Sequence, residues 1–351
     1  MVFWRDERLG LTARFRGLAR GAGAMFATGE NGVIAAAQSV SGPWSFIPSG
    51  TTANLVSGVF HGNSLFIVGE NETTLQSEPL YPSRLINIAT RGAVGAGADA
   101  MISGFVVSGS APKQVLLRAA GPALRTFGLD RALTSPVLTL FDGASRPMAT
   151  NRGWANASTI AEASARVGAF PFAAGSADAA LLVTLEPGAY TAQVTSSNAA
   201  TGLALVEAYD AETLATEGSR AINISTRGQV GAGADRLIAG FVIHGAASRR
   251  VLIRAVGPSL AAFGLDATLA EPQLELVDSR GNWLRRAGPW STEPDAAEVE
   301  AAAAVAGAFA LSDGSKDAAI VAALLPGSYT VQVSGVNDTT GVALVEVYDL
   351  P

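Results

Sequence analysis

Two pairs of carboxylates recur at matching places in the chain and are the first candidates for chemistry. Asp142 and Glu207 form one pair, and Asp278 and Glu346 form the other. Two carboxylates that flank a glycosidic bond are the usual machinery of glycoside hydrolysis. Because both pairs are duplicated, catalysis would require two active sites in tandem. Ion pairs with the arginines of the two repeats explain the pattern more simply, with Arg254 expected to meet Glu346 or Asp278. We therefore expect no enzyme activity.

Asp142 and Asp278 are also candidate calcium ligands. Each ends a strand-like run and precedes a short turn, Gly-Ala-Ser or Ser-Arg-Gly. Carboxylate and carbonyl oxygens gathered at such a turn can bind a hard cation. An aspartate that only stabilises its own turn is the alternative. No other cofactor is indicated.

Three tryptophans are candidate ligand-binding residues. An exposed indole can stack on the apolar face of a sugar ring. Trp154 and Trp290 occupy matching positions, which is typical of core residues. Trp283 has no counterpart and follows Asn282 in a polar turn, so it is the strongest candidate for an exposed platform.

A glycine-rich phrase occurs twice and could cradle a phosphate. It reads INIATRGAVGAGAD at 86–99 and INISTRGQVGAGAD at 222–235. A nucleotide-binding P-loop requires Lys-Ser or Lys-Thr after its last glycine, and here Ala-Asp follows. A dinucleotide loop opens a helix, whereas a strand-like run follows here. The phrase therefore predicts a turn or bulge that joins two strands.

The composition of the chain argues against several classes of function. The chain has 351 residues, a net charge of −6 and no cysteine, so disulfides and thiolate metal sites are excluded. A basic face with interleaved aromatics is absent, which argues against nucleic-acid binding. No run of ~18 uncharged apolar residues predicts a membrane span. The first residues lack the apolar core of a signal peptide, so an exported protein would need a segment upstream of Met1.

Most of the chain is an internal duplication. Arg84 returns as Arg220, Gly121-Pro122 as Gly257-Pro258, and Trp154 as Trp290, all at one spacing. Beyond Trp290 the spacing grows by a few residues, which predicts a longer loop or helix edge there. The expected domains are 82–212 and 218–351, preceded by a different segment, 1–80.

Each repeat is predicted to be a β-sandwich, jelly-roll-like, with one short helix. Short runs rich in Val, Ile, Leu and Tyr are separated by Pro, Gly, Asp and Ser. In LPGSYTVQV the apolar residues alternate with polar ones, as in a strand with one buried face. The helices are expected to open with capping boxes at Thr159–Glu162 and Asp295–Glu298.

The first 80 residues contain a shorter duplication. ATGENGVI and IVGENETTL align, and the ~40-residue period of short strands is typical of propeller blades. The segment resembles about two blades of the BNR/sialidase-like propellers. Since propellers usually have four or more blades, a partial propeller is expected here.

The phrases VLIRAVGPSL, LPGSYTVQVSG and GVALVEVYD resemble tandem C-terminal modules of large secreted bacterial proteins, including pre-peptidase C-terminal (PPC-like) domains. The resemblance covers residues 82–351. It implies a non-catalytic module in an extracellular or cell-surface setting. Related modules often read N-D-D-W before the tryptophan, whereas this chain has Asn151-Arg152-Gly153-Trp154, which weakens the calcium hypothesis.

Together these observations predict a structural or adhesion module, or a weak carbohydrate-binding module, of a secreted bacterial protein. Its expected partner is a polysaccharide or cell-surface glycan. The alternative is an accessory region of a glycoside hydrolase or another propeller hydrolase whose catalytic part lies upstream.

Overall fold

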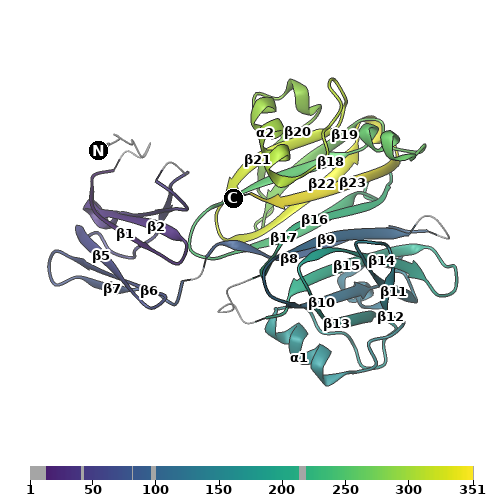
Figure 1. Cartoon of the computed structure of the whole chain (residues 1–351), viewed down its shortest axis with the longest axis horizontal. Helices are drawn as coiled ribbons and strands as arrows, with labels where there is room; N and C mark the ends of the chain where they lie inside the picture. The colour runs from purple at the N-terminus through teal and green to yellow at the C-terminus, as the bar shows by residue number, and fades with distance from the viewer. Residues whose placement is uncertain (1–12, 41–42, 81, 96–99, 213–218, 351) are drawn as a thin grey trace. The chain divides into compact units, whose positions relative to one another are not determined.

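The structure is a computed structural model that describes residues 13–40, 43–80, 82–95, 100–212 and 219–350. The described chain is mostly β and is built from antiparallel sheets, as predicted (Figure 1). It divides into two compact units, each described here by itself. The first comprises residues 1–84 together with 243–250 and 323–327, and the second comprises the rest.

The first unit contains two small antiparallel sheets. One has four strands in sequence order, and the other has three. They are β1 (Phe15–Gly21), β2 (Ala24–Gly29), β3 (Ile34–Ala37) and β4 (Ser45–Ile47), then β5 (Leu55–His61), β6 (Ser64–Gly69) and β7 (Thr74–Gln76). No closed propeller occurs within the described residues.

The duplication inside this unit is visible in its turns. Gly29 N–H donates to Val33 O at 2.9 Å, and Gly69 N–H donates to Thr73 O at 2.8 Å. Arg16 contacts carboxylates of both copies, Glu30 at 3.2 Å and Glu70 at 2.8 Å. A shared apolar core, which includes Phe26, Leu55 and Ile67, lies under the two sheets.

The second unit holds most of both long repeats, and equivalent strands carry equivalent sequences. The first repeat contains β8 (Arg84–Val94), β9 (Met101–Gly109), β10 (Lys113–Ala120), β11 (Pro136–Asp142), β12 (Pro147–Asn151), β13 (Ala179–Leu185), β14 (Gly188–Ser196) and β15 (Gly202–Asp210). The second contains β16 (Ser219–Val230), β17 (Leu237–His244), β18 (Arg249–Val256), β19 (Pro272–Asp278), β20 (Trp283–Ala287), β21 (Ala318–Leu324), β22 (Gly327–Gly335) and β23 (Gly341–Asp349).

The first strand of each repeat joins strands of the other repeat. β8 pairs with β15 of its own repeat and lies next to β17 of the second. β16 pairs with β23 of its own repeat and with β9 of the first. The described strands of both repeats consequently form one continuous hydrogen-bonded sheet system of 16 strands.

A pair of equivalent residues marks the centre of this exchange. Thr90 and Thr226 hold the same place in the two repeats, and both are buried. The hydroxyl of Thr90 donates to that of Thr226 at 2.9 Å, and Thr226 donates to Ser103 at 3.2 Å. Thr90 thus contacts its own equivalent, and β8 lies next to β17 as β16 pairs with β9, which is the reciprocal pattern of a two-fold interface.

One α-helix packs on each repeat, as expected, although the predicted capping box of the first is wrong. α1 (Ser158–Arg166) begins after Ala157, so Thr159 lies inside the helix. α2 (Ala296–Ala306) does begin after Asp295, but that carboxylate pairs with Arg285 at 2.6 Å instead of capping. The short helix η4 (Trp290–Thr292) and the longer α2 account for the extra residues of the second repeat.

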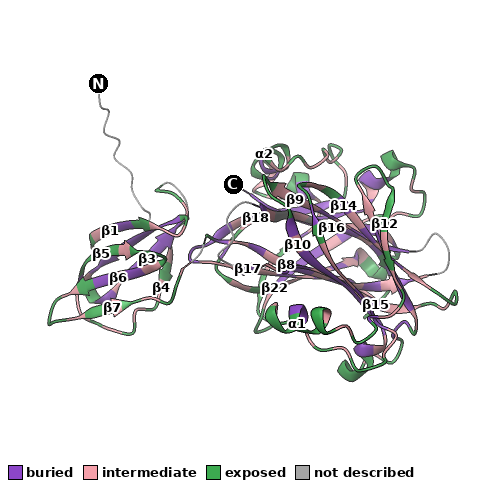
Figure 2. Cartoon of the chain, turned by 60° about the horizontal axis from the view of Figure 1, so that its bottom comes forward, coloured by how far each residue is buried: buried purple, intermediate pink, exposed green. Residues whose placement is uncertain are grey.

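Apolar residues alternate along the strands, and the buried ones form the cores (Figure 2). α2 covers Leu252, Ala319 and Tyr348 of the sheet that contains β18, β21 and β23. α1 covers Leu116 and Tyr209 in the same way. Among the described residues, the cores under α1 and α2 include no residue of β19, β20 or β22.

In each repeat, a buried aspartate just before one strand binds the backbone of the turn that follows another, Asp317 before β21 and Asp178 before β13. Asp317 is inaccessible to solvent, and its Oδ1 accepts the backbone N–H groups of Gly257 at 2.7 Å and Ser259 at 3.3 Å. The hydroxyl of Ser259 donates to Oδ2 at 2.5 Å. Both carboxylate oxygens therefore have a donor, as a buried charge requires.

The equivalent aspartate of the first repeat is less well satisfied. Asp178 Oδ1 accepts the N–H groups of Gly121 at 2.7 Å and Ala123 at 3.2 Å. Ala123 replaces the serine of the other repeat, and Oδ2 has no hydrogen-bond partner among the described residues.

We expect Ala123→Ser to stabilise the protein by about 1 kcal/mol. The added hydroxyl would donate to the unpartnered oxygen of Asp178, and hydrogen bonds to buried charges contribute about 1.5–3 kcal/mol before the cost of fitting the group. The matched change, Ser259→Ala, should destabilise by about 1.5–3 kcal/mol. Urea unfolding followed by far-UV circular dichroism measures both. If the serine hydroxyl played no part, Ala123→Ser would not raise the free energy of unfolding and Ser259→Ala would not lower it.

Candidate functional site

The candidate site begins with the hairpin that presents Trp283. The carboxylate of Asp278 shapes the turn between β19 and β20. Its Oδ1 accepts the N–H groups of Arg280 and Asn282, both at 2.8 Å, and its Oδ2 accepts Nδ2 of Asn282 at 2.9 Å. This turn fixes where β20 starts and hence where Trp283 lies.

Trp283 is exposed, as the sequence predicts. Its residue exposure is 63%, and the guanidinium of Arg286 lies 3.5 Å from the centroid of its ring. Arginine stacked on an indole is a favourable cation–π contact. Since the arginine covers one face of the ring, the exposed area belongs to the other face and the edges. The indole thus lies against the Arg286 guanidinium and has its other face open to solvent.

A buried carboxylate organises the polar groups beside Trp283. Glu275 on β19 is only 5% exposed. Its Oε1 forms an ion pair with Nε of Arg286 at 2.7 Å, and its Oε2 accepts a hydrogen bond from Nη1 of Arg236 at 3.0 Å. The same Nη1 donates to Oε1 of Gln332 at 3.1 Å. The four polar residues and Trp283 are named here the Trp283 face.

The backbone register explains why these side chains meet. Glu275 lies opposite Arg286 on β20 and opposite Gln332 on β22, so all three point to the same side of the sheet. Arg236 directly precedes β17, the next strand along. Trp283 lies opposite Val277, two positions further along the same side of β19. The result is a row of polar groups across four strands with an indole at one end.

The first repeat carries no such arrangement on its equivalent face. Ala100, Thr139, Pro147 and Thr150 stand where the second repeat has Arg236, Glu275, Trp283 and Arg286. Thr150 and Thr139 share a hydroxyl contact at 3.3 Å in place of the ion pair. Only the glutamine is retained, as Gln193. The scaffold is duplicated, whereas the Trp283 face is specific to one repeat.

Trp154 and Trp290 are core residues. Trp154 is 8% exposed, and its Nε1 donates to Ala173 O at 3.2 Å. Trp290 is equally buried, and its Nε1 donates to Ser315 Oγ at 3.2 Å. Neither indole presents an open face for a sugar ring.

The two candidate calcium ligands are occupied by their own turns. Asp142 Oδ1 accepts the N–H groups of Ala144 and Arg146, both at 2.9 Å, and Oδ2 pairs with the Arg146 guanidinium at 2.7 Å. Asp278 behaves alike. These hydrogen bonds lower the pKa of both carboxyls, with the backbone of Arg146 foremost for Asp142 and the side chain of Asn282 foremost for Asp278. No cluster of three or more His, Asp or Glu suited to a metal occurs in the described ranges.

The lowered pKa of Asp278 predicts that this residue's contribution to thermal stability is lost at acid pH. A carboxyl whose folded pKa is depressed stabilises the fold above its unfolded pKa, and that stability is lost as the pH falls through the folded value. We expect wild type and Asp278→Ala to differ in thermal midpoint at pH ~6 and to converge at pH ~2.5. Scanning calorimetry checks this, and a difference that persists at acid pH would contradict it.

The carboxylate pairs considered for catalysis do not meet. Glu207 lies on β15 and pairs with Arg118 at 3.3 Å, whereas Asp142 at the end of β11 pairs with Arg146. Glu346 pairs with Arg254, with 2.6 Å between Nη2 and Oε2. Burial raises the pKa of Glu207 above its ordinary value. The Arg118–Glu207 and Arg254–Glu346 pairs are internal, whereas the Asp142–Arg146 pair lies at an exposed turn.

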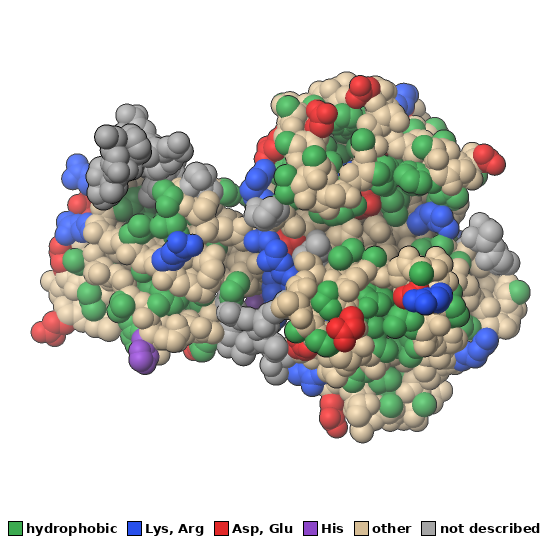
Figure 3. Space-filling view, in the orientation of Figure 1, with side chains coloured by type: hydrophobic (Ala, Val, Ile, Leu, Met, Phe, Trp, Pro, Cys, Tyr) green, Lys and Arg blue, Asp and Glu red, His purple; other side chains and the backbone are tan. Residues whose placement is uncertain are grey.

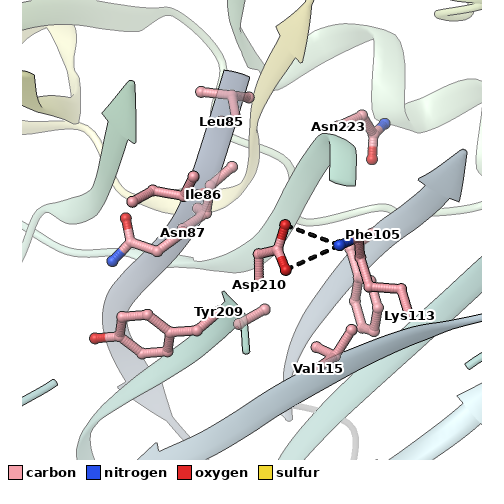
Figure 4. Close-up of a pocket in the computed structure, with 11 residues that line it drawn as sticks. Leu85, Ile86, Asn87, Phe105, Lys113, Val115, Tyr209, Asp210 and Asn223 are labelled. Atoms are coloured by element: carbon pink, nitrogen blue, oxygen red, sulfur yellow. Dashed lines mark hydrogen bonds and ion pairs between the residues drawn. The ribbon is translucent and has the colours of Figure 1, made fainter. Parts of the chain in front are cut away.

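A second buried ion network lies beside a small cavity (Figure 4). Nζ of Lys113 contacts both carboxylate oxygens of Asp210 and one of Glu212, all at 2.9 Å. The adjoining cavity measures about 10 Å³, which is room for about one water molecule. This network ties β10 to the end of β15 and offers no ligand site.

The glycine-rich phrase forms strand and turn, as predicted. In the second copy Thr226 and Arg227 lie in β16, and the turn follows it. Gly231 N–H donates to Asp235 O at 2.7 Å, and Asp235 N–H donates to Ala232 O at 3.2 Å. Residues 96–99 of the first copy lie outside the described residues.

Sequence reasoning found Trp283 but missed Arg236, Glu275, Arg286 and Gln332. Charged residues at outward positions of a strand look like an ordinary solvated surface. The signal was available in the duplication: these positions differ between repeats that otherwise match.

Comparisons with known proteins give little further guidance. No protein-family model matches the chain, and no curated protein matches it. Among solved structures it is similar to a DUF4785 family protein from Legionella pneumophila, with 11% identity, a TM-score of 0.22 and coverage of 75% of this chain and 63% of that one. A GH31 alpha-xylosidase from Xanthomonas citri matches with 8% identity, a TM-score of 0.13 and coverage of 95% and 32%. The chain thus spans less than two thirds of either protein.

Proposed function

We propose that this chain is a non-catalytic extracellular or cell-surface module that binds a polysaccharide weakly, each long repeat being a jelly-roll-like β-sandwich. The observation that carries the proposal is the Trp283 face. Its indole is exposed on one side and held by Arg286 on the other. Hydrogen-bonding groups lie beside it on a rigid sheet, which suits a ligand with one apolar face and many hydroxyls.

Electrostatics fits a glycan better than a nucleic acid. The chain has a net charge of −6. On the surface drawn in Figure 3, acidic and basic side chains are scattered among uncharged and hydrophobic ones. Nucleic-acid binding depends chiefly on neutralising phosphates with a basic surface. No helix of the described chain is long and apolar enough to cross a membrane.

The test is binding of the full chain to a panel of glycans. Insoluble polysaccharides are used in pull-downs and soluble ones in affinity gels, each with and without calcium. Retention on at least one glycan, lost when Trp283 is replaced, supports the proposal. Absence of retention on every glycan contradicts it and leaves a spacer or adhesion role.

A further inference from the structure

We propose that the Trp283 face is selective for acidic polysaccharides whose sugars carry carboxylates, that is, uronates. This inference deepens the proposed function and rests on it. It concerns the charge of the ligand, because a stacking indole can bind neutral and charged sugars alike.

The first observation is the charge of the face. Arg236 and Arg286 both contact Glu275, so one carboxylate serves two cations. The cluster has a net charge of about +1 on a chain whose total is −6. The hairpin turn adds one acid and one base, Asp278 and Arg280, which cancel. Arg285 on the same strand is engaged elsewhere, with Asp295 at 2.6 Å.

The second observation is the set of unused donors. Arg286 contacts Glu275 through Nε, and its side chain is 46% exposed. Its two Nη groups make no hydrogen bond within the described part of the chain. Arg236 uses Nη1 for Glu275 and Gln332 and a long Nε contact to Gly233 O at 3.4 Å.

These donors suit a carboxylate. The two terminal nitrogens of a guanidinium can bind both oxygens of a carboxylate in parallel, the strongest arginine–acid geometry. Glu275 and the indole already hold the guanidinium of Arg286 in place, so little side-chain freedom is lost on binding. In a polyuronate, one sugar ring can stack on the open face of Trp283 while a neighbouring carboxylate meets Arg286.

The first repeat supplies the comparison. Its equivalent face has threonines in place of Glu275 and Arg286 and an alanine in place of Arg236. At these positions the first repeat has neither a cation nor an aromatic platform, although its strands are the equivalents of those in the second. The sheet therefore forms without these arginines, which fits a role for them in binding an anion.

The experiment compares each acidic ligand with its neutral form. Oligogalacturonate, alginate oligosaccharide and hyaluronan oligosaccharide are titrated into the full chain by calorimetry, together with their carboxyl-reduced forms. We expect at least one acid form to bind about tenfold or more tightly than its reduced form. Dextran sulfate tests whether any polyanion suffices, and binding as tight as that of the best uronate would overturn the inference.

The matched variant copies the first repeat. Arg236→Ala, Glu275→Thr and Arg286→Thr together remove the cations without leaving a buried carboxylate unpaired, and circular dichroism checks the fold. We expect the acid-to-neutral affinity ratio to fall to about one. A ratio that stays high would overturn the assignment to these arginines. Equal binding of acid and neutral forms by wild type would overturn the inference alone, whereas no glycan binding would also overturn the proposed function.

Discussion

Arg254→Ala is expected to lower the free energy of unfolding by about 3–5 kcal/mol, the usual cost of removing one partner of a buried ion pair. Arg254 is fully buried. Its Nε donates to Glu346 Oε2 at 2.7 Å, its Nη1 donates to Phe309 O at 2.6 Å, and its guanidinium lies 4.3 Å from the ring centroid of Phe309. Without it, the carboxylate of Glu346 stays buried, and among the described residues its remaining hydrogen-bond donor is the Tyr348 hydroxyl at 2.7 Å. Such a loss is a large fraction of the 5–15 kcal/mol typical of a domain.

A double variant separates the cost of an orphaned charge from the loss of packing. Arg254→Met with Glu346→Leu replaces both ions by apolar groups of similar length, which is often close to neutral. Urea unfolding followed by circular dichroism should therefore show a smaller loss for the double variant than for Arg254→Ala. An equal or larger loss would contradict the ion-pair explanation.

The first repeat gives an internal comparison. Arg118 is equally buried and lies 4.0 Å from the ring centroid of Phe172, but its nitrogens make no hydrogen bond within the described residues. Its contact with Glu207 is 3.3 Å. We therefore expect Arg118→Met to destabilise less than Arg254→Met in the same assay.

Much of the scaffold could be predicted because each signal is local. Alternation of apolar residues located the strands, and the duplication fixed which of them are equivalent. The glycine-rich turn and the two helices were also recognisable. The start of α1 was mispredicted because Thr159 and Glu162 imitate a capping box, whereas the N-cap is Ala157, two residues before Thr159.

The exchange of first strands could not be predicted from sequence. INIATRG and INISTRG are almost the same strand, so each satisfies the alternation required beside β9 or β17 equally well. Because the two strands are so alike, their sequences do not indicate which of them pairs with β9 and which lies next to β17.

Of the candidate site, Trp283 could be predicted from the sequence, whereas its charged neighbours could not. Trp283 stood out because an unmatched aromatic in a polar turn is unusual. Its charged neighbours come from β19, β20 and the residue before β17, which are far apart in sequence, and only the sheet register brings them together. The buried position of Glu275 between two arginines is a property of that register.

Trp283→Ala is expected to weaken glycan binding about 30-fold. Tryptophans at the centre of an interface commonly contribute about 2 kcal/mol or more, which corresponds to about 30-fold in affinity. The side chain is 63% exposed and its ring has no packing role in the described core, so stability should change little. The measurement is calorimetric titration of the full chain with the glycan retained best in the panel.

The matched control is Met148→Ala. Met148 is 51% exposed on β12, the first-repeat strand equivalent to β20, and removal of its side chain takes away a comparable exposed apolar group. Binding should stay within about twofold of wild type, because Met148 belongs to the first repeat, which lacks the polar row. If the two variants lost affinity equally, the glycan would be contacting apolar surface in general, and the Trp283 face would not be its site. If neither lost affinity, the indole would be a surface residue whose exposure serves another purpose.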